Sequence, residues 1–336
     1  MKIFSPLTLL AMVSFSGFAS QPESTLQLEN VFDLEYANQL EMTNNGKTVY
    51  FVRNRMDIKS DRKVSNIWSV DSDSTLLQPL TSGVHMDYSP VLSPDESRLA
   101  FISTRDGSSQ IYIKWLKTGA VAKISNLIES PSSLHWSPNG KQLIFSKFVP
   151  AKVASPVNLP GKPEGADWAD PAKYIDEVYY RADGGGYTKA GFSHLFSIDA
   201  NGGNARQLTS GNFNHGGAIS FAEDGNSLYF SSNRHDEYKL KPTNSEIYTL
   251  DLTSLAITAV TDRVGPDSQP RVSPNGRYLA YTGYDDKRTN YENTQLYIRD
   301  LKSGKTTSLT TDFDRSVGQI KWADDSKGVY FSYASE

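Results

Sequence analysis

The sequence contains no cysteine, so disulfide bonds and a lipid-modified N-terminal cysteine are excluded. It also lacks the Gly-x-Ser-x-Gly motif that places a serine nucleophile on a sharp strand-to-helix turn, because the one suitable glycine pair, Gly161 and Gly165, brackets Pro163. Basic residues are not in excess: 34 Lys and Arg stand against 38 Asp and Glu, for a net charge of −4, and no run of basic residues is longer than two. The chain therefore offers no basic face for phosphates, and nucleic acid is not expected among its ligands.

What the sequence does contain is one phrase repeated six times: a turn of Asn or Asp with a small or polar partner, followed by a run of alternating apolar residues. Such turn residues tolerate positive φ and close tight hairpins, and the β-branched and aromatic content of the runs is typical of buried strands. Each phrase therefore predicts one hairpin of a repeated unit. The six copies occupy residues 45–51, 95–101, 139–145, 224–230, 275–281 and 325–331.

The spacing of the phrases predicts the architecture. Four of the five steps are 44 to 51 residues long, which is the period of a four-stranded propeller blade, and no helical pattern lies between them. Each unit also contains an inner strand before the hairpin, a further strand that ends at an acidic or polar corner, and a short closing strand. The prediction is an all-β protein: a β-propeller of four-stranded blades over residues 25–336, truncated, with five complete blades and a partial sixth.

One step between phrases is too long by roughly 35 residues. The excess, residues 150–190, falls inside the third blade. It begins rich in proline, alternates in polarity through residues 174–181 and ends in Asp183-Gly184-Gly185-Gly186, so we expect an extended arm and a strand or hairpin that reaches off the disc. A tolerated surface excursion is the alternative, because loops accept long insertions. The aromatic density of the segment favours a projection that shapes a binding mouth.

The first twenty residues are a separate segment. Lys2 is followed by a mostly apolar run to Phe18, and small residues occur at its end, at Gly17 and Ala19. This is the pattern of a secretory signal peptide over residues 1–20. The run is too short to span a bilayer comfortably, although a buried first strand or an anchor helix is the alternative. We therefore expect a periplasmic or secreted protein that has no membrane association after signal cleavage.

The sequence predicts no cofactor and no metal. Its five histidines lie in different blades without the i, i+4 spacing of a zinc helix, and we expect most of them to be solvated loop or capping residues. Residues 183–186 lack the flanking strand and helix of a phosphate-binding loop, so a flexible hairpin tip is expected there. The short acidic stretches at residues 71–73 and 312–314 are too short for a calcium loop.

Several stretches resemble the propellers of the prolyl oligopeptidase family of serine peptidases, in particular those of bacterial acylaminoacyl-peptidase and dipeptidyl-peptidase relatives. The resemblance runs from about residue 25 to the end and is most specific in the third to fifth blades. It rests on residues 179–184, 194–196, 206–211, 213–217, 231–234, 281–286, 322 and 330–333. The turn phrases alone also match the propeller of the Tol-system periplasmic protein.

The resemblance implies a propeller that admits and holds peptide, joined to a C-terminal α/β-hydrolase domain. The sequence ends 11 residues after its sixth hairpin turn, so we expect the hydrolase domain to be absent and carry over no catalytic residue. The expected partners are a peptide substrate and the missing hydrolase domain of the same polypeptide. A non-enzymatic periplasmic binding propeller, similar to the Tol-system protein, and a free-standing sensor or scaffold are the alternatives.

Three residues of the insertion are candidates for contacting the peptide: Glu177, Tyr180 and Arg181. A carboxylate such as that of Glu177 can pair with the amino terminus of a peptide. A guanidinium such as that of Arg181 can pair with a carboxylate or a carbonyl.

Overall fold

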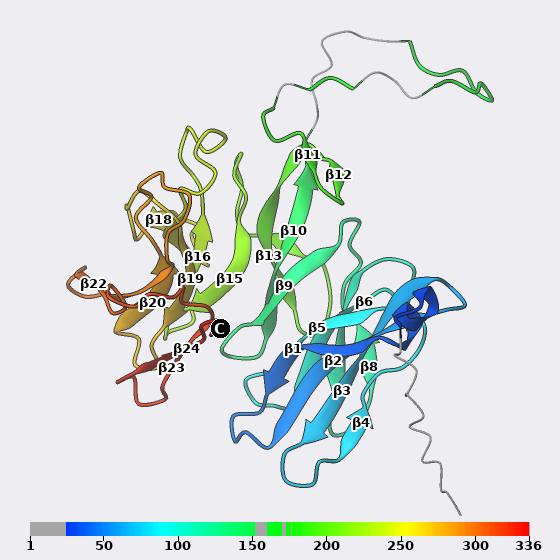
Figure 1. Ribbon diagram of the computed structural model, residues 1–336, viewed down its shortest axis with the longest axis horizontal. Coiled ribbons are helices and arrows are strands. Elements are labelled where there is room, and N and C mark those ends of the chain that lie inside the picture. Colours follow the sequence, from blue (N-terminus) through cyan, green and yellow to red (C-terminus); the bar gives the residue numbers. More distant parts are fainter. Residues whose placement is uncertain (1–24, 152–159, 170–172, 176, 336) are drawn as a thin grey trace, which may run out of the picture.

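The computed structural model describes residues 25–151, 160–169, 173–175 and 177–335. The predicted signal peptide, residues 1–20, lies outside the described residues. A short 3-10 helix, η1 (Leu28–Asp33), precedes the first strand and was not predicted from the sequence. All other regular elements of the described chain are strands, arranged in successive antiparallel sheets (Figure 1).

Five of these sheets have four strands each, which confirms the predicted propeller blades. The first blade contains β1 (Glu35–Met42), β2 (Thr48–Asp57), β3 (Arg62–Asp71) and β4 (Leu77–Pro79). The second contains β5 (Asp87–Leu92), β6 (Arg98–Ser103), β7 (Gln110–Trp115) and β8 (Val121–Lys123). The third contains β9 (Pro131–Trp136), β10 (Gln142–Pro150), β13 (Gly191–Asp199) and β14 (Arg206–Gln207).

The fourth blade contains β15 (Gly216–Phe221), β16 (Ser227–Ser232), β17 (Glu246–Asp251) and β18 (Ile257–Ala259). The fifth contains β19 (Asp267–Val272), β20 (Tyr278–Gly283), β21 (Gln295–Asp300) and β22 (Thr306–Ser308). The partial sixth blade consists of β23 (Ile320–Trp322) and β24 (Val329–Phe331). A separate two-stranded hairpin, β11 (Arg181–Ala182) with β12 (Gly186–Tyr187), belongs to the insertion.

The repeated turn phrases close the hairpins as their chemistry requires. In the third blade, the side-chain oxygen of Asn139 accepts hydrogen bonds from the Ser137 hydroxyl at 2.8 Å and from the Lys141 amide at 2.9 Å. Gly140 between them adopts φ of 65°, a conformation that glycine enters without steric cost. The inner strand is thereby turned back onto the second strand in the register that buries the alternating apolar residues.

Each complete blade is also closed by a hydroxyl group, an arrangement that we call the blade clasp. A Ser or Thr after the fourth strand accepts a hydrogen bond from the backbone N–H of a buried third-strand residue 14 positions earlier. Because the third-strand N–H would otherwise be buried without a partner, the clasp satisfies a group that is costly to leave unpaired. The pairs are Ile67 with Thr81, Ile111 with Ser125, Leu195 with Thr209, Ile247 with Thr261 and Leu296 with Thr310.

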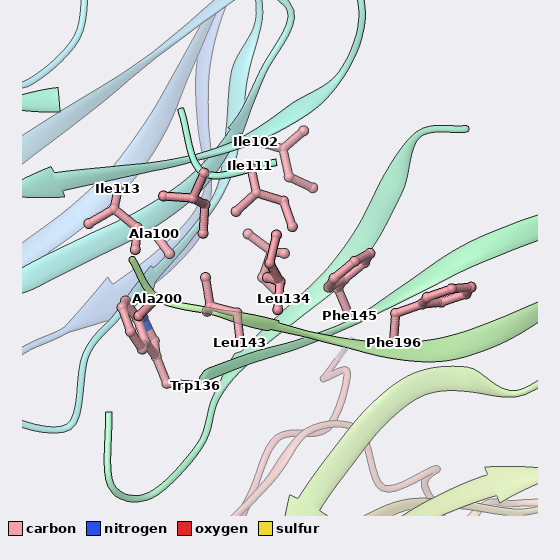
Figure 2. Close-up of a cluster of buried hydrophobic side chains, with 12 residues drawn as sticks. Ala100, Ile102, Ile111, Ile113, Leu134, Trp136, Leu143, Phe145, Phe196 and Ala200 are labelled. Carbon is pink, nitrogen blue, oxygen red and sulfur yellow. The ribbon is translucent and has the colours of Figure 1, made fainter. Parts of the chain in front are cut away.

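The largest apolar cluster lies between the second and third blades (Figure 2). Ile102 and Ile111 of the second blade and Leu143 and Phe145 of the third are fully buried in it. The ring of Phe145 stacks on that of Phe196, with centroids 5.8 Å apart. Neighbouring blades therefore share one core, so the sheets stabilise one another rather than standing alone.

Candidate functional site

One end of every blade carries two kinds of connection: the one between the second and third strands, and the one that leads from the fourth strand into the next inner strand. We call this end the rim. The Gly265 amide joins the two kinds of connection by donating to Asn244 Oδ1 at 2.9 Å, and the Ser193 amide, near the start of β13, donates to Asn214 Oδ1 in the connection before β15 at 2.9 Å. The insertion leaves from this rim, and the side chains gathered here form the candidate functional site.

The insertion begins as an extension of the third blade. Strands β10 and β13 stay paired over nine positions, from Gln142 opposite Asp199 to Pro150 opposite Gly191; the corresponding strands pair over ten positions in the first blade and over six in the second, fourth and fifth. The described part of the insertion then continues beyond the end of β10, with β11 and β12 close to it (Figure 1). The lengthened strands thus carry the insertion away from the blade.

A hairpin occurs in the insertion and turns at the glycine run, where a hairpin tip was expected, but its first strand is only the end of the alternating stretch 174–181. Only Arg181 and Ala182 are paired before the turn, opposite Tyr187 and Gly186. Gly184 and Gly186 adopt φ of 73° and 72°, which places the reversal at the glycine run. The described residues of the alternating stretch before Arg181 belong to no strand, although the Tyr180 carbonyl accepts a hydrogen bond from the Thr188 amide at 2.9 Å beside the hairpin.

The three predicted contact residues are all exposed and all lie on the insertion. Glu177 forms an ion pair with Lys239 of the fourth blade, with 2.7 Å between Oε1 and Nζ. Tyr180 and Arg181 lie at the hairpin instead, where the ring of Tyr180 is 6.4 Å from that of Tyr187. Their contact with a peptide stays a prediction.

The connection between β16 and β17, residues 233–245, supports the base of the insertion. The ring of Tyr238 makes edge contacts with Phe192 at the start of β13, at 6.4 Å, and with Phe213 before β15, at 5.6 Å. Lys239 next to it holds Glu177. The fourth blade therefore contacts the third blade beside the insertion through an aromatic cluster and the insertion itself through an ion pair.

The expectation that most histidines are solvated is wrong for two of them. His194 at the start of β13 and His215 before β15 have exposed fractions of 4% and 0%, and their rings stack 5.2 Å apart. A guanidinium N–H of Arg234 contacts His215 Nε2. Burial, and then the positive charge of Arg234, lowers the pKa of His215 to about 3. The two histidines belong to different blades, so their contact has no signal in sequence spacing.

Sequence reasoning also missed a buried carboxylate at the rim. Glu246, the first residue of β17, is 2% exposed; its Oε2 accepts a hydrogen bond from the Thr261 hydroxyl at 2.7 Å, and its Oε1 lies 3.5 Å from His235 Nε2. Burial raises the pKa of Glu246 to about 7, although the hydrogen bond from Thr261 opposes the shift. The sequence did contain a signal for Glu246, because it is the one carboxylate at the third-strand position that precedes the clasp residue in each complete blade. The other four complete blades carry an amide or a histidine there: Asn66, Gln110, His194 and Gln295.

Two further properties of the described chain bear on its chemistry. Within the residues that the structure describes, no group of three or more His, Cys, Asp and Glu side chains is arranged to hold a metal ion. In the same part of the chain, no helix has the length and apolar character needed to cross a membrane.

Comparison with known families divides the chain into two matched regions. Residues 41–154 match the TolB beta propeller domain. Residues 185–291 match the dipeptidyl peptidase IV (DPP IV) N-terminal region. The insertion therefore lies largely between the two matches.

Whole-chain comparisons connect this propeller to peptidases. The chain is 26% identical to dipeptidyl-peptidase 5 of Porphyromonas gingivalis over 357 residues, an alignment that covers 100% of this chain and 50% of that protein. The chain thus spans half the length of this relative. Among solved structures, it is similar to acylaminoacyl peptidase of Pyrococcus horikoshii, with a TM-score of 0.65 and 18% identity over 90% of this chain and 43% of the other.

A solved propeller domain agrees with the assignment of the fold. The β-propeller domain of the Trilobed protease from Pyrococcus furiosus gives a TM-score of 0.56 at 16% identity, covering 90% of this chain and 78% of that one. The chain is a β-propeller homologous to those of prolyl oligopeptidase family peptidases, related to the dipeptidyl peptidase IV N-terminal region and to dipeptidyl-peptidase 5.

Proposed function

We propose that this chain is the substrate-gating propeller of a secreted serine peptidase that acts on short peptides. The observation that carries the proposal is the similarity to a dipeptidyl-peptidase over the full length of the chain. Acyl transfer to a serine requires a positioned nucleophile, a base and an oxyanion hole, so hydrolysis is assigned to a hydrolase domain of the same polypeptide. The secretion part of the proposal rests on the signal-like pattern of residues 1–20.

The rim is the part of the propeller that suits gating. The insertion exposes five aromatic side chains, which offer apolar and polar contact area to a peptide: Trp168, Tyr174, Tyr179, Tyr180 and Tyr187. Glu177 adds a carboxylate for an amino terminus and Arg181 a guanidinium for a carbonyl or carboxylate. Because the insertion is also braced by Tyr238 and Lys239, it can present these groups in a restricted position.

The first prediction concerns Glu177 and Arg181 in the polypeptide that includes the hydrolase domain. Glu177→Gln and Arg181→Gln should each raise KM for dipeptidyl chromogenic substrates several-fold, by up to about tenfold, while kcat changes little, because lost binding of the ground and transition states alike appears in KM. Glu164→Gln is the matched control, since Glu164 is an exposed carboxylate elsewhere on the insertion. An unchanged kcat/KM in both variants would remove the assignment.

A second prediction concerns the 336-residue chain by itself. It should leave aminoacyl and dipeptidyl chromogenic substrates intact and should not react with an organophosphate probe for activated serines, because no Gly-x-Ser-x-Gly turn is present to activate one. Mass spectrometry of probe-treated protein measures this directly. A labelled serine on a folded monomeric chain would show that the propeller carries its own nucleophile.

The match of residues 41–154 to the TolB beta propeller domain favours a second candidate, a periplasmic propeller that binds a partner without catalysis. Sequencing the gene beyond codon 336 separates the two functions. A hydrolase-coding sequence in frame supports the peptidase, and its absence together with an inert chain supports the binding propeller.

A further inference from the structure

Buried ion pairs occur at the rims of the second and fifth blades. Asp87, the first residue of β5, is 0% exposed and accepts a hydrogen bond from Arg105 Nη2 at 3.0 Å. Asp267, the first residue of β19, is equally buried and pairs with Arg263. In both blades a fully buried carboxylate thus balances the charge of a guanidinium.

These arginines also rest on aromatic rings. The Arg105 guanidinium carbon lies 4.7 Å from the ring centre of Tyr112, and that of Arg263 lies 4.0 Å from the ring centre of Tyr297. The ring removes the guanidinium partly from water, where an uncompensated charge is unfavourable. The carboxylate partner therefore matters for the stability of each arrangement.

The fourth blade has the arginine and the rings but lacks the carboxylate. In the second blade Asp87 lies opposite Ser103, two residues before Arg105. In the fourth blade Gly216 lies opposite Ser231, so the residue before it, His215, lies opposite Ser232. Ser232 is two residues before Arg234, just as Ser103 is two residues before Arg105. His215 therefore occupies the register position of Asp87, and a histidine replaces the carboxylate.

His215 does not supply a compensating negative charge. Its pKa is lowered to about 3, so the ring is neutral at pH 7 and its Nε2 accepts from Arg234. Among the described residues Arg234 has no ion pair, because the nearby acid Glu237 is paired with Lys241 and Glu246 faces His235. The remaining N–H groups of Arg234 have no hydrogen-bond partner in the described chain, and the residue is half-buried.

We propose that Arg234 is the binding site for a carboxylate group of a peptide, either its C-terminus or an acidic side chain. The guanidinium lies 5.0 Å from the ring centre of Phe213 and 5.7 Å from that of Tyr248, and these rings hold it in place. A carboxylate fits the paired N–H groups of a guanidinium, and the partly apolar surroundings strengthen the interaction. Only the identification of the ligand as a peptide rests on the proposed function.

The location fits this ligand. Arg234 begins the same connection, residues 233–245, that carries Tyr238 and Lys239 against the base of the insertion. A peptide held at the rim would therefore meet a free guanidinium on the fourth blade next to the aromatic cluster. In the second and fifth blades the guanidinium groups of Arg105 and Arg263 are already paired with Asp87 and Asp267. The fourth blade differs because the charge of Arg234 is not balanced by a carboxylate of the described chain.

The test is a calorimetric titration of the 336-residue chain with three probes: an N-acetyl dipeptide with a free C-terminal carboxylate, the same dipeptide as its C-terminal amide, and inorganic phosphate. Acetylation removes the amino group that Glu177 would recognise, so the result is independent of the first prediction and of catalysis. Only the carboxylate form should bind. Equal binding of the amide, or binding of phosphate alone, would overturn the proposal.

Two variants locate the site. Arg234→Gln should weaken binding of the carboxylate dipeptide by at least about tenfold, as expected for loss of a charged hydrogen-bond partner. His215→Asp recreates the pairing of the second blade and should weaken binding equally while the circular dichroism spectrum and the melting temperature are retained. Arg277→Gln, an exposed arginine that pairs with Asp300 at the opposite end of the fifth blade, is the control. Unchanged affinity in a folded His215→Asp protein would refute the assignment.

Discussion

Replacing Phe145 by alanine should lower the free energy of unfolding by about 3 to 5 kcal/mol, the usual cost of removing a fully buried aromatic ring. Phe145 is 0% exposed and stacks on Phe196 in the cluster shared by the second and third blades. The loss should be this large because blade packing on both sides restricts collapse of the cavity. Urea denaturation followed by tryptophan fluorescence measures it.

The matched control for this prediction is Tyr291→Ala, which removes an aromatic ring that is 72% exposed. It should change the free energy of unfolding by no more than about 0.5 kcal/mol. If both substitutions had the same small effect, the apolar cluster between these blades could not be the main source of their stability.

Acid should destabilise the fold through the half-buried His135 and the buried His215. Burial, followed by the charge of a neighbouring arginine, lowers the pKa of His135 to about 4 and that of His215 to about 3. The unfolded chain binds protons at these residues below about pH 6.5, whereas the folded chain does not until much lower pH. Stability is therefore fully present above pH 6.5 and falls as the pH decreases, by at most about 1.4 kcal/mol per pH unit for each histidine.

Glu246 acts in the opposite direction. Its pKa is raised to about 7, so the folded chain binds this proton below pH 7 while the unfolded chain does so only near pH 4.5. Its contribution to the free energy of unfolding therefore grows as the pH falls across that range, and this gain offsets the loss caused by one of the two histidines. Taken together, His135, His215 and Glu246 contribute a loss of at most about 1.4 kcal/mol per pH unit between pH 6.5 and 4.5.

Urea denaturation at pH 7, 6 and 5 tests this balance. His135→Gln should flatten the loss, because the amide cannot take up a proton in the unfolded state. Glu246→Gln should steepen it, because the opposing carboxyl is gone. A pH dependence that is identical in the wild type and both variants would assign acid sensitivity to other groups.

The blades were predictable because their information is local. The turn at Asn139 and Gly140 and the alternating run after it lie within a few residues of one another, so one pass along the chain finds each hairpin. The helix η1 escaped prediction because it buries none of its residues and so has no apolar periodicity to reveal it. The turn of the insertion's hairpin was predictable from its glycine run, but the extent of its strands was not, because they are two residues long and too short to show a period.

The rim chemistry was less predictable because it arises between blades. His194 and His215 are 21 positions apart in the sequence but stack across the boundary of the third and fourth blades. The replacement of Asp87 by His215 becomes visible only when strand register aligns the two blades. Glu177, Tyr180 and Arg181 were found to be exposed, but exposure alone does not reveal what they bind.

The blade clasp has a consequence for how such proteins change over evolutionary time. Both partners of every clasp belong to the same blade and are separated by the same 14 positions, so a blade carries its own closing device when its coding segment is duplicated or exchanged. The third blade illustrates this independence: Leu195 and Thr209 both follow the insertion, and their hydrogen bond is 2.9 Å long, against 2.8 to 2.9 Å in the blades that lack an insertion. Lengthening one rim connection therefore leaves the closure of the blade unaltered, which lets new recognition elements be tried without redesign of the scaffold.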